Sequence, residues 1–491
     1  MSLKQKTVDG LMWSFIDTAI GQGIQFIVSI VLARLLIPRE FGLIGMILIF
    51  IALSEAFVNS GFSSALIRKK NCSQTDYSTV FVFNLVAGVV FFIALFFAAP
   101  FISNFFNEPQ LKPIVQVLGL VLIVDSLTLI QRTILTRQID FKLQARVSFI
   151  ASAGSGIVAI YMAWQGMGVW SLVAQRISRQ TINTVFLLFW TKWKPSLHFS
   201  FKSFKELFGF GSKLLISNLI DTFYNNVYYL LIGKYFSAQQ LGFYTRADEF
   251  NRLPSYNLSA IIQRVSYPVL CSIQDDPVKL VHSYRRFIRS SMFISFNIMM
   301  LMAAMAEPLI ITLIGEKWRE SVSYFQLLCF TGMFYPLHVL NLNIIQVKGR
   351  SDLFLKLEII KKILAVPTII LGVAFGIKAM IAGMMVNTLI DFYLNNSNSR
   401  QMIGYSFKQQ IRDILPSFSM ALIIALAVYS IGAVLSTGYG ATLAIQSIFG
   451  LALIVVISEF TRLSDYIFLK ETVREKMMPS AKRVVVEQAE V

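Results

Sequence analysis

The chain has 491 residues, of which 55% are hydrophobic and only 14% charged, against about a quarter charged in an ordinary soluble domain. This composition excludes a soluble enzyme with a single anchor, because one soluble core cannot hide so much apolar side chain. The formal charge of +17 does not indicate a nucleic-acid partner, since the basic residues are scattered through short loops and do not gather on one polar face.

Apolar windows bounded by charged residues or by Gly/Pro breaks predict fourteen membrane-spanning helices of about 20 residues each. The first six lie at 10–33, 41–62, 78–101, 113–135, 145–164 and 168–190. The next six lie at 210–233, 240–263, 290–314, 322–345, 356–376 and 378–398, and two more follow at 414–435 and 440–460. The sequence therefore predicts an all-α integral membrane protein.

The lysines and arginines alternate between successive loops, as the positive-inside rule requires of a correct set of spans. With the N-terminus inside, the inside segments hold 32 of the 44 basic residues and the outside segments seven, while five arginines lie within spans. We therefore expect an even number of crossings, with both termini in the cytoplasm.

The three cysteines, Cys72, Cys271 and Cys329, are widely spaced and form no CxxC or Cys/His cluster. We therefore expect no disulfide, no metal ion and no cofactor. No cleavable signal is expected either, because the charged N-terminus runs directly into an apolar stretch without a small-residue cleavage site.

Three short matches in constant order indicate that the chain contains a duplicated membrane unit. Residues 34–42 line up with 234–242, Pro100 and Glu108 with Pro308 and Glu316, and Asp140-Phe141 with Asp352-Leu353. We therefore expect a six-helix lobe at 1–200, a second six-helix lobe at 201–405, two extra helices at 406–470 and a cytoplasmic tail at 471–491.

Several loop and helix-end patterns resemble the polysaccharide-transporter branch of the multidrug/oligosaccharidyl-lipid/polysaccharide (MOP) exporter superfamily, which includes the Wzx-type O-antigen and colanic-acid flippases. The patterns are Gly10–Trp13 (GLMW), Ala33–Leu43 (ARLLIPREFGL), Thr136–Phe141 (TRQIDF), Gly166–Val173 (GMGVWSLV), Leu241–Ala247 (LGFYTRA) and Leu313–Trp318 (LIGEKW). The resemblance implies the MOP exporter fold and a flippase of the bacterial inner membrane. Such a protein is no enzyme; it moves an undecaprenyl-diphosphate-linked oligosaccharide from the cytoplasmic to the periplasmic leaflet.

Charged side chains inside a span are costly, at least about 2.5 kcal/mol at the bilayer centre, so they normally face a bundle interior or a wet cavity. In the sixth span, Arg176, Arg179, Gln180 and Asn183 share one helix face, and in the seventh Asn218, Asp221, Thr222 and Asn225 do the same. The first span carries Asp17, and the eighth carries Arg246, Asp248, Glu249 and Arg252. Several spans therefore have polar faces.

These residues fit the parts of a lipid-linked sugar. Arginine suits a diphosphate, because its planar guanidinium stays charged and donates two hydrogen bonds to one phosphate. We expect headgroup binding by Arg176, Arg179, Arg246 and Arg252, with Asn183, Asn218 and Asn225. The candidates for coupling to H+ or Na+ are Asp17, Asp221, Asp248 and Glu249, since coupling needs a titratable or ion-binding group. In a second interpretation, such residues are ion pairs that hold the bundle together, above all Asp248 and Arg252, four residues apart.

Two other functions stay open at this point. A drug or cation antiporter of the same superfamily is the nearest alternative, although cavity arginines favour an anionic headgroup. A membrane-embedded polysaccharide polymerase or ligase would need a sizeable outside loop with catalytic groups, and the predicted outside loops are short. The expected partners are the lipid-linked oligosaccharide, membrane lipids, a coupling cation and, by the resemblance, a polysaccharide polymerase; no nucleic acid is expected.

Overall fold

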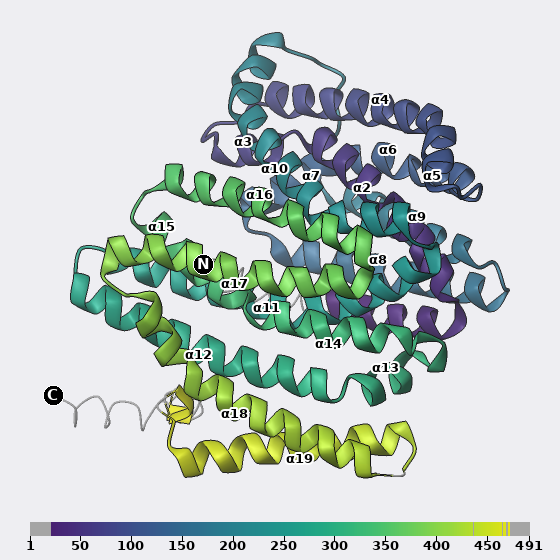
Figure 1. Cartoon of the computed structure of the whole chain (residues 1–491). Coiled ribbons are helices and arrows are strands. Elements are labelled where there is room, and N and C mark those ends of the chain that lie inside the picture. The colour runs from purple at the N-terminus through teal and green to yellow at the C-terminus, as the bar shows by residue number, and fades with distance from the viewer. Residues whose placement is uncertain (1–20, 436, 464, 468–469, 472–491) are drawn as a thin grey trace, which may run out of the picture. The chain divides into compact units, whose positions relative to one another are not determined.

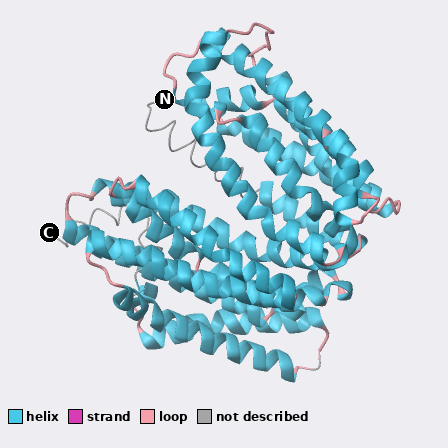
Figure 2. Ribbon diagram, turned by 45° about the horizontal axis from the view of Figure 1, so that its top comes forward, coloured by secondary structure: helices cyan, strands magenta, loops and turns pink. Residues whose placement is uncertain are grey.

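The computed structural model of the chain describes residues 21–435, 437–463, 465–467 and 470–471 (Figure 1). Within this part of the chain, all regular secondary structure is helical and no strand occurs (Figure 2). Asp17 and the beginning of the first predicted span lie outside the described residues.

The chain divides into two compact units, Met1–Thr245 and Arg246–Val491. The first unit contains a helix at Gly21–Leu35, α2 (Pro38–Asn59), α3 (Phe62–Arg68), α4 (Gln74–Phe106), α5 (Leu111–Leu118), α6 (Leu120–Ser126), α7 (Leu129–Gln138), α8 (Phe141–Trp164), α9 (Val169–Trp190) and α10 (Phe201–Tyr235). The border lies inside α11 (Ala238–Ser272), whose first residues approach α2, and α10 packs along α2, α3 and α4. This division does not test the two duplicated lobes, which stay a prediction.

The second unit continues from the middle of α11. Its helices are α12 (Pro277–Ala304), α13 (Ala306–Ile314), the short η1 (Glu316–Trp318), α14 (Glu320–Met333), α15 (Tyr335–Val347), α16 (Ser351–Phe375), α17 (Ile377–Ile403), α18 (Phe407–Val434) and α19 (Tyr439–Thr461). Helix α18 lies against α12, and α19 packs on α18 and α13 (Figure 1). The last two helices are therefore packed onto the second unit.

Local sequence sets the start of α4, and the fourth predicted span is bent. Ser73 begins α4 with a capping box, in which its hydroxyl accepts from the Asp76 amide at 3.2 Å and the Asp76 carboxylate accepts from the Ser73 amide at 2.9 Å. The fourth predicted span consists of α5, α6 and α7, and it bends by 41° between Ser126 and Leu129.

Eight described helices are long and apolar enough to cross a membrane, or nine if the bent segment counts as one span. The prediction of a multi-span helical membrane protein is thereby confirmed, whereas the number fourteen stays a prediction. Every predicted window coincides with a helix at least in part. The long helices that are less apolar are α9, α10, α11 and α16: α9 carries two arginines among amide and hydroxyl side chains, and each of the others carries at least five charged residues.

Helices α2 and α11 cross in the first unit at two glycines. A Cβ on Gly42 would lie 1.6 Å from the Ala238 carbonyl oxygen, and a Cβ on Gly242 would lie 1.9 Å from the Pro38 carbonyl oxygen. Only glycine allows such a close approach of two backbones. The two contacts are reciprocal, and the four positions are those that the sequence repeat pairs, 38 with 238 and 42 with 242.

A buried network of amide side chains joins four helices of the second unit. Tyr284 of α12 donates to Asn341 of α15 at 2.6 Å, and Gln410 of α18 donates to the same oxygen at 3.2 Å. Asn396 of α17 donates to Gln410 at 2.7 Å. Because buried polar groups are costly to separate from their partners, this network fixes α18 to the unit.

Candidate functional site

Arg176 of α9 forms an ion pair with Glu55 of α2. Its Nη2 lies 2.8 Å from Glu55 Oε1, and the two side chains are 40% and 27% exposed. The sequence showed no acidic residue within a turn of Arg176 on its own helix, but a carboxylate from another helix compensates its charge. The ion-pair interpretation that the sequence raised for α11 therefore also applies to Arg176.

One turn further along α9, Gln180 contacts a second carboxylate. Its Nε2 donates to Asp125 Oδ1 of α6 at 2.5 Å, and Arg132 Nη1 of α7 lies 3.5 Å from the same oxygen. Arg132 also donates to Gln180 Oε1 at 3.4 Å. We call Glu55, Asp125, Arg132, Arg176 and Gln180 the α9 cluster.

Arg179 and Asn183 continue the polar face of α9, and both side chains are half-buried. The structure therefore brings Arg176 and Gln180 together with three residues that the polar pattern of the spans does not indicate, Glu55, Asp125 and Arg132. Asp125 could have been noticed as a lone acid in an apolar window. Arg132 falls within the predicted span 113–135, although the count of basic residues includes it among the inside segments, and in the structure it belongs to α7.

The predicted residues of α10 are more exposed than those of α9. Asn218, Asp221 and Asn225 are all exposed in the described structure and follow one another at helical spacing, while Thr222 between them is half-buried. A spanning helix with such a polar stripe needs water or protein beside it, since lipid cannot satisfy these groups. This stripe is a second polar surface, separate from the contacts of the α9 cluster.

On α11, all four predicted charged residues are paired. Arg246 pairs with Glu249, and Arg252 Nε lies 2.8 Å from Oδ2 of Asp248, whose side chain is only 7% exposed. The Arg252 guanidinium also lies over the Tyr256 ring at 5.5 Å, and that ring stacks on Tyr335 at 4.3 Å. Arg252 is thus held by a carboxylate and an aromatic face.

A further group of charged residues lies among α15, α16 and α17 of the second unit. Glu358 and Lys361 form an ion pair on α16, and Lys361 is only 10% exposed. Lys361 also interacts electrostatically with Asp391 of α17 and with His338 of α15, whose ring contacts Asn395 at 3.5 Å. We call Glu358, Lys361, Asp391 and His338 the α16 cluster; the count of basic residues includes Lys361 among the inside segments, so the sequence did not indicate this group.

Outside the predicted spans, Arg350 and Asp352 form a bidentate pair at the turn between α15 and α16. Arg350 Nε and Nη2 donate to the two carboxylate oxygens at 2.9 and 2.8 Å, and these hydrogen bonds hold the pKa of Asp352 at about 2. All three cysteines are free. In the part of the chain that the structure describes, no three His, Cys, Asp or Glu side chains gather as a metal site.

With this geometry established, comparison with known proteins gives the family. The family model described as "Polysaccharide biosynthesis protein" matches residues 31–323, which is more than half of the chain. The chain belongs to this family. The matched residues of this polysaccharide biosynthesis protein include all of α9, α10 and α11, which carry the predicted headgroup residues.

Curated relatives agree with the resemblance read from the sequence. The lipopolysaccharide biosynthesis protein WzxC of Escherichia coli (strain K12) is 26% identical over 442 residues, covering 89% of each chain. The teichuronic acid biosynthesis protein TuaB of Bacillus subtilis (strain 168) is 23% identical and covers 72% of this chain and 73% of its own. The succinoglycan biosynthesis transport protein ExoT of Rhizobium meliloti (strain 1021) is 22% identical over 62% of each chain.

Solved structures confirm the predicted fold class. The lipid II flippase MurJ superposes with a TM-score of 0.74 at 15% identity, over 93% of this chain and 99% of that one. A multidrug resistance MATE family transporter of the MOP superfamily gives 0.58 at 14% identity, over 79% and 98%. At these identities the likeness shows the fold alone, which is the MOP-type transporter fold. These relatives and structural neighbours are named as biosynthesis, transport or flippase proteins, which agrees with the prediction of a transporter rather than an enzyme.

Proposed function

We propose that the chain is a flippase that moves an undecaprenyl-diphosphate-linked oligosaccharide repeat unit from the cytoplasmic to the periplasmic leaflet of the bacterial inner membrane. The observation that carries the proposal is the row of arginine and amide side chains on α9, in a polysaccharide biosynthesis protein with a transporter fold. A sugar chain cannot cross hydrocarbon unaided, because each unpaired hydroxyl costs several kcal/mol there. A polar path through the protein removes that barrier while the polyprenyl tail stays in lipid.

Within α9, Arg179 is the proposed ligand of the diphosphate. Arg179 lies half-buried on the polar face of α9, and its guanidinium would supply the paired hydrogen bonds that a phosphate accepts. Arg176, which forms an ion pair with Glu55, is a further proposed headgroup ligand. Asn183, together with Asn218 and Asn225 of the α10 stripe, would bind sugar hydroxyls. Arg246 and Arg252 are proposed as further headgroup ligands.

Coupling to H+ or Na+ would act through the paired carboxylates. Asp248 and Glu249 hold Arg252 and Arg246, so binding of a cation to either acid would release an arginine for the substrate. Moving one charge through 100 mV supplies about 2.3 kcal/mol, which is enough to shift such an equilibrium. Asp221 on the exposed stripe and Asp17 are the other candidates. The proposed cycle alternates between a state open to the cytoplasm and a state open to the periplasm. Both termini lie in the cytoplasm in this proposal, and a polysaccharide polymerase is a proposed partner.

A strain that lacks the chain tests this function. We expect lipid-linked oligosaccharide to accumulate in the cytoplasmic leaflet, and wild-type protein supplied in trans to clear it. Normal glycan export in the deletion strain, with no other flippase present, would contradict the proposal.

A drug or cation antiporter is the second candidate, because the fold is shared with MATE family transporters. The arginines of α9 and α11 argue against a cationic substrate. Uptake of cationic dyes into vesicles that contain the protein separates the two: dye transport at rates above empty vesicles would favour the antiporter. The expected result is no dye transport.

A further inference from the structure

An open surface pocket of about 650 Å³ lies in the second unit, between the last turns of α11 and the end of α15, and its α11 side chains are exposed. Its lining includes Ala260, Gln263, Arg264, Tyr267 and Pro268 of α11 and Gln346 of α15. Arg264 lies twelve residues beyond Arg252, which is about 18 Å along a helix. We call this space the α11 cavity; the α9 cluster, the α16 cluster and the ion pairs of α11 contribute no residue to it.

Arg264 differs from the other arginines of the polar spans. Arg176, Arg246 and Arg252 each pair with a carboxylate, whereas Arg264 makes no ion pair or hydrogen bond with any described residue. No carboxylate lines the α11 cavity, and the nearby Arg350 is engaged by Asp352. The cavity therefore carries a net positive charge and favours an anionic ligand.

The rest of the lining offers side chains that can form hydrogen bonds with hydroxyl groups. Gln263 and Gln346 offer amides that both donate and accept, and neither side chain makes a hydrogen bond with a described residue. Tyr267 lies three residues after Arg264, on the same face of α11, and adds a phenol. Pro268 has no N–H, so the helix supplies no i+4 donor to the Arg264 carbonyl.

We propose that the α11 cavity is a docking site for a phosphorylated saccharide, in which Arg264 holds the phosphate and the two glutamines hold sugar hydroxyls. The inference rests on the proposed function, because it names where the headgroup of that substrate first binds. The positive-inside pattern puts this end of α11 at the cytoplasmic face, where the substrate is made. None of the arginines of α9 lines this cavity.

Local protection of a cysteine tests the site in the purified full-length protein. Ala260→Cys places a thiol in the cavity wall, and its reaction with a small thiol reagent is followed on its own peptide by mass spectrometry. The probe is farnesyl-diphosphate-linked N-acetylglucosamine, compared with farnesyl diphosphate without sugar. We expect both probes to slow labelling of the Ala260→Cys variant. The additional substitution Gln346→Ala should weaken the protection given by the sugar-bearing probe and leave the protection given by farnesyl diphosphate unchanged.

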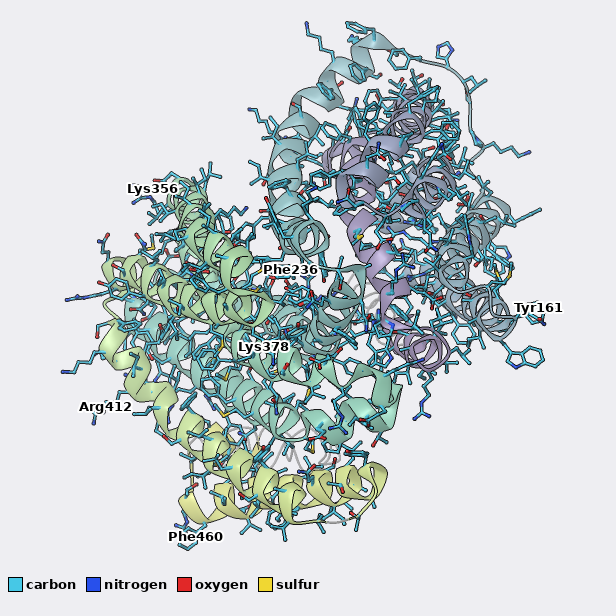
Figure 3. All side chains as sticks on the ribbon, turned by 45° about the vertical axis from the view of Figure 1, so that its right-hand side comes forward. Tyr161, Phe236, Lys356, Lys378, Arg412 and Phe460 are labelled. Carbon is cyan, nitrogen blue, oxygen red and sulfur yellow. The ribbon has the colours of Figure 1, made fainter. Side chains whose placement is uncertain are left out.

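The variant Arg264→Gln tests whether Arg264 binds the phosphate of the probe. The matched control is Arg412→Gln, at an exposed arginine of α18 that lies outside the cavity (Figure 3). Arg264→Gln should raise the probe concentration needed for protection at least about tenfold, because a charge-assisted hydrogen bond is lost. Arg412→Gln should change it less than twofold. Unchanged protection in Arg264→Gln would overturn the proposal.

Two further outcomes separate related explanations. Phosphatidylglycerol vesicles at equal phosphate concentration should give no protection. If they protect the wild-type site and Arg264→Gln abolishes that protection, the ligand is an anionic lipid and the assignment to a saccharide is overturned. If Arg264 is needed for protection but the reconstituted wild type moves no lipid-linked saccharide, the docking site stands and the flippase proposal fails.

Discussion

Glu55 of α2 and Arg176 of α9 form an ion pair at 2.8 Å, across 121 positions of the chain. Because both side chains are only partly exposed, the pair should contribute about 0.5–1 kcal/mol to the packing of α9 on α2. We predict that Glu55→Gln and Arg176→Gln each lower the melting temperature and that the double variant is no worse than either. Thermal unfolding of the four proteins in detergent measures this coupling, and strictly additive losses would show that the pair contributes nothing.

The second prediction concerns Asp248, which is almost fully buried against Arg252. Arg252→Ala leaves this carboxylate without its charge partner, and we expect a loss of about 1–3 kcal/mol in stability and a lower protein level. Asp248→Asn combined with Arg252→Ala should recover most of the loss, because the buried charge is then gone. Melting curves of the single and double variants check this rescue. Equal instability of both would assign the effect to lost packing of the arginine stem.

The third prediction uses the crossing of α2 and α11. Gly42→Ala places a methyl group 1.6 Å from the Ala238 carbonyl oxygen, so the backbones must separate, at a cost of about 1–3 kcal/mol or more. Gly23→Ala is the matched control, since a Cβ at that helical position meets nothing within 4 Å. We expect the control to be neutral or stabilising, because alanine favours the helix. A Gly42→Ala protein as stable as the control would mean that the two helices do not meet in this way.

The fourth prediction concerns orientation. Single cysteines replacing the exposed Lys205 and Lys356 should be shielded from an impermeant thiol reagent in intact cells, while cysteines replacing Ser237 and Lys378 should react. Lys356 and Lys378 are suited to this test because they lie near opposite ends of α16 (Figure 3). Permeabilised cells provide the control for reactivity. Labelling of Lys356→Cys from outside would reverse the proposed topology.

Helical periodicity was enough to predict which polar residues share a face, but it says nothing about the helix opposite that face. Arg176 and Gln180 were therefore selected correctly as neighbours on α9, whereas their carboxylate partners, Glu55 and Asp125, were missed. The pair of Asp248 and Arg252 could be predicted, because both residues lie on one helix, four positions apart.

Span boundaries were the other source of error. Arg132 and Lys361 lie inside the predicted windows 113–135 and 356–376, yet the count of basic residues includes both among the 32 of the inside segments. In the structure both lie within helices and contact other charged or amide side chains, since packed helices satisfy polar groups internally. Composition and periodicity thus predict the helical membrane fold, while contacts between distant helices require the three-dimensional structure.

The most direct test of the proposed flippase is translocation by the purified protein in vesicles. A fluorescent undecaprenyl-diphosphate-linked oligosaccharide is placed in the inner leaflet, and its appearance in the outer leaflet is followed with an impermeant quencher, for wild type, Arg179→Ala and Arg179→Lys. We predict rapid appearance with wild type, background rates with Arg179→Ala, and partial activity with Arg179→Lys, which keeps the charge without the bidentate geometry. Translocation by well-folded Arg179→Ala at the wild-type rate would contradict the assignment of the headgroup to α9, and background rates with wild type under an imposed membrane potential and ion gradient would contradict the flippase itself.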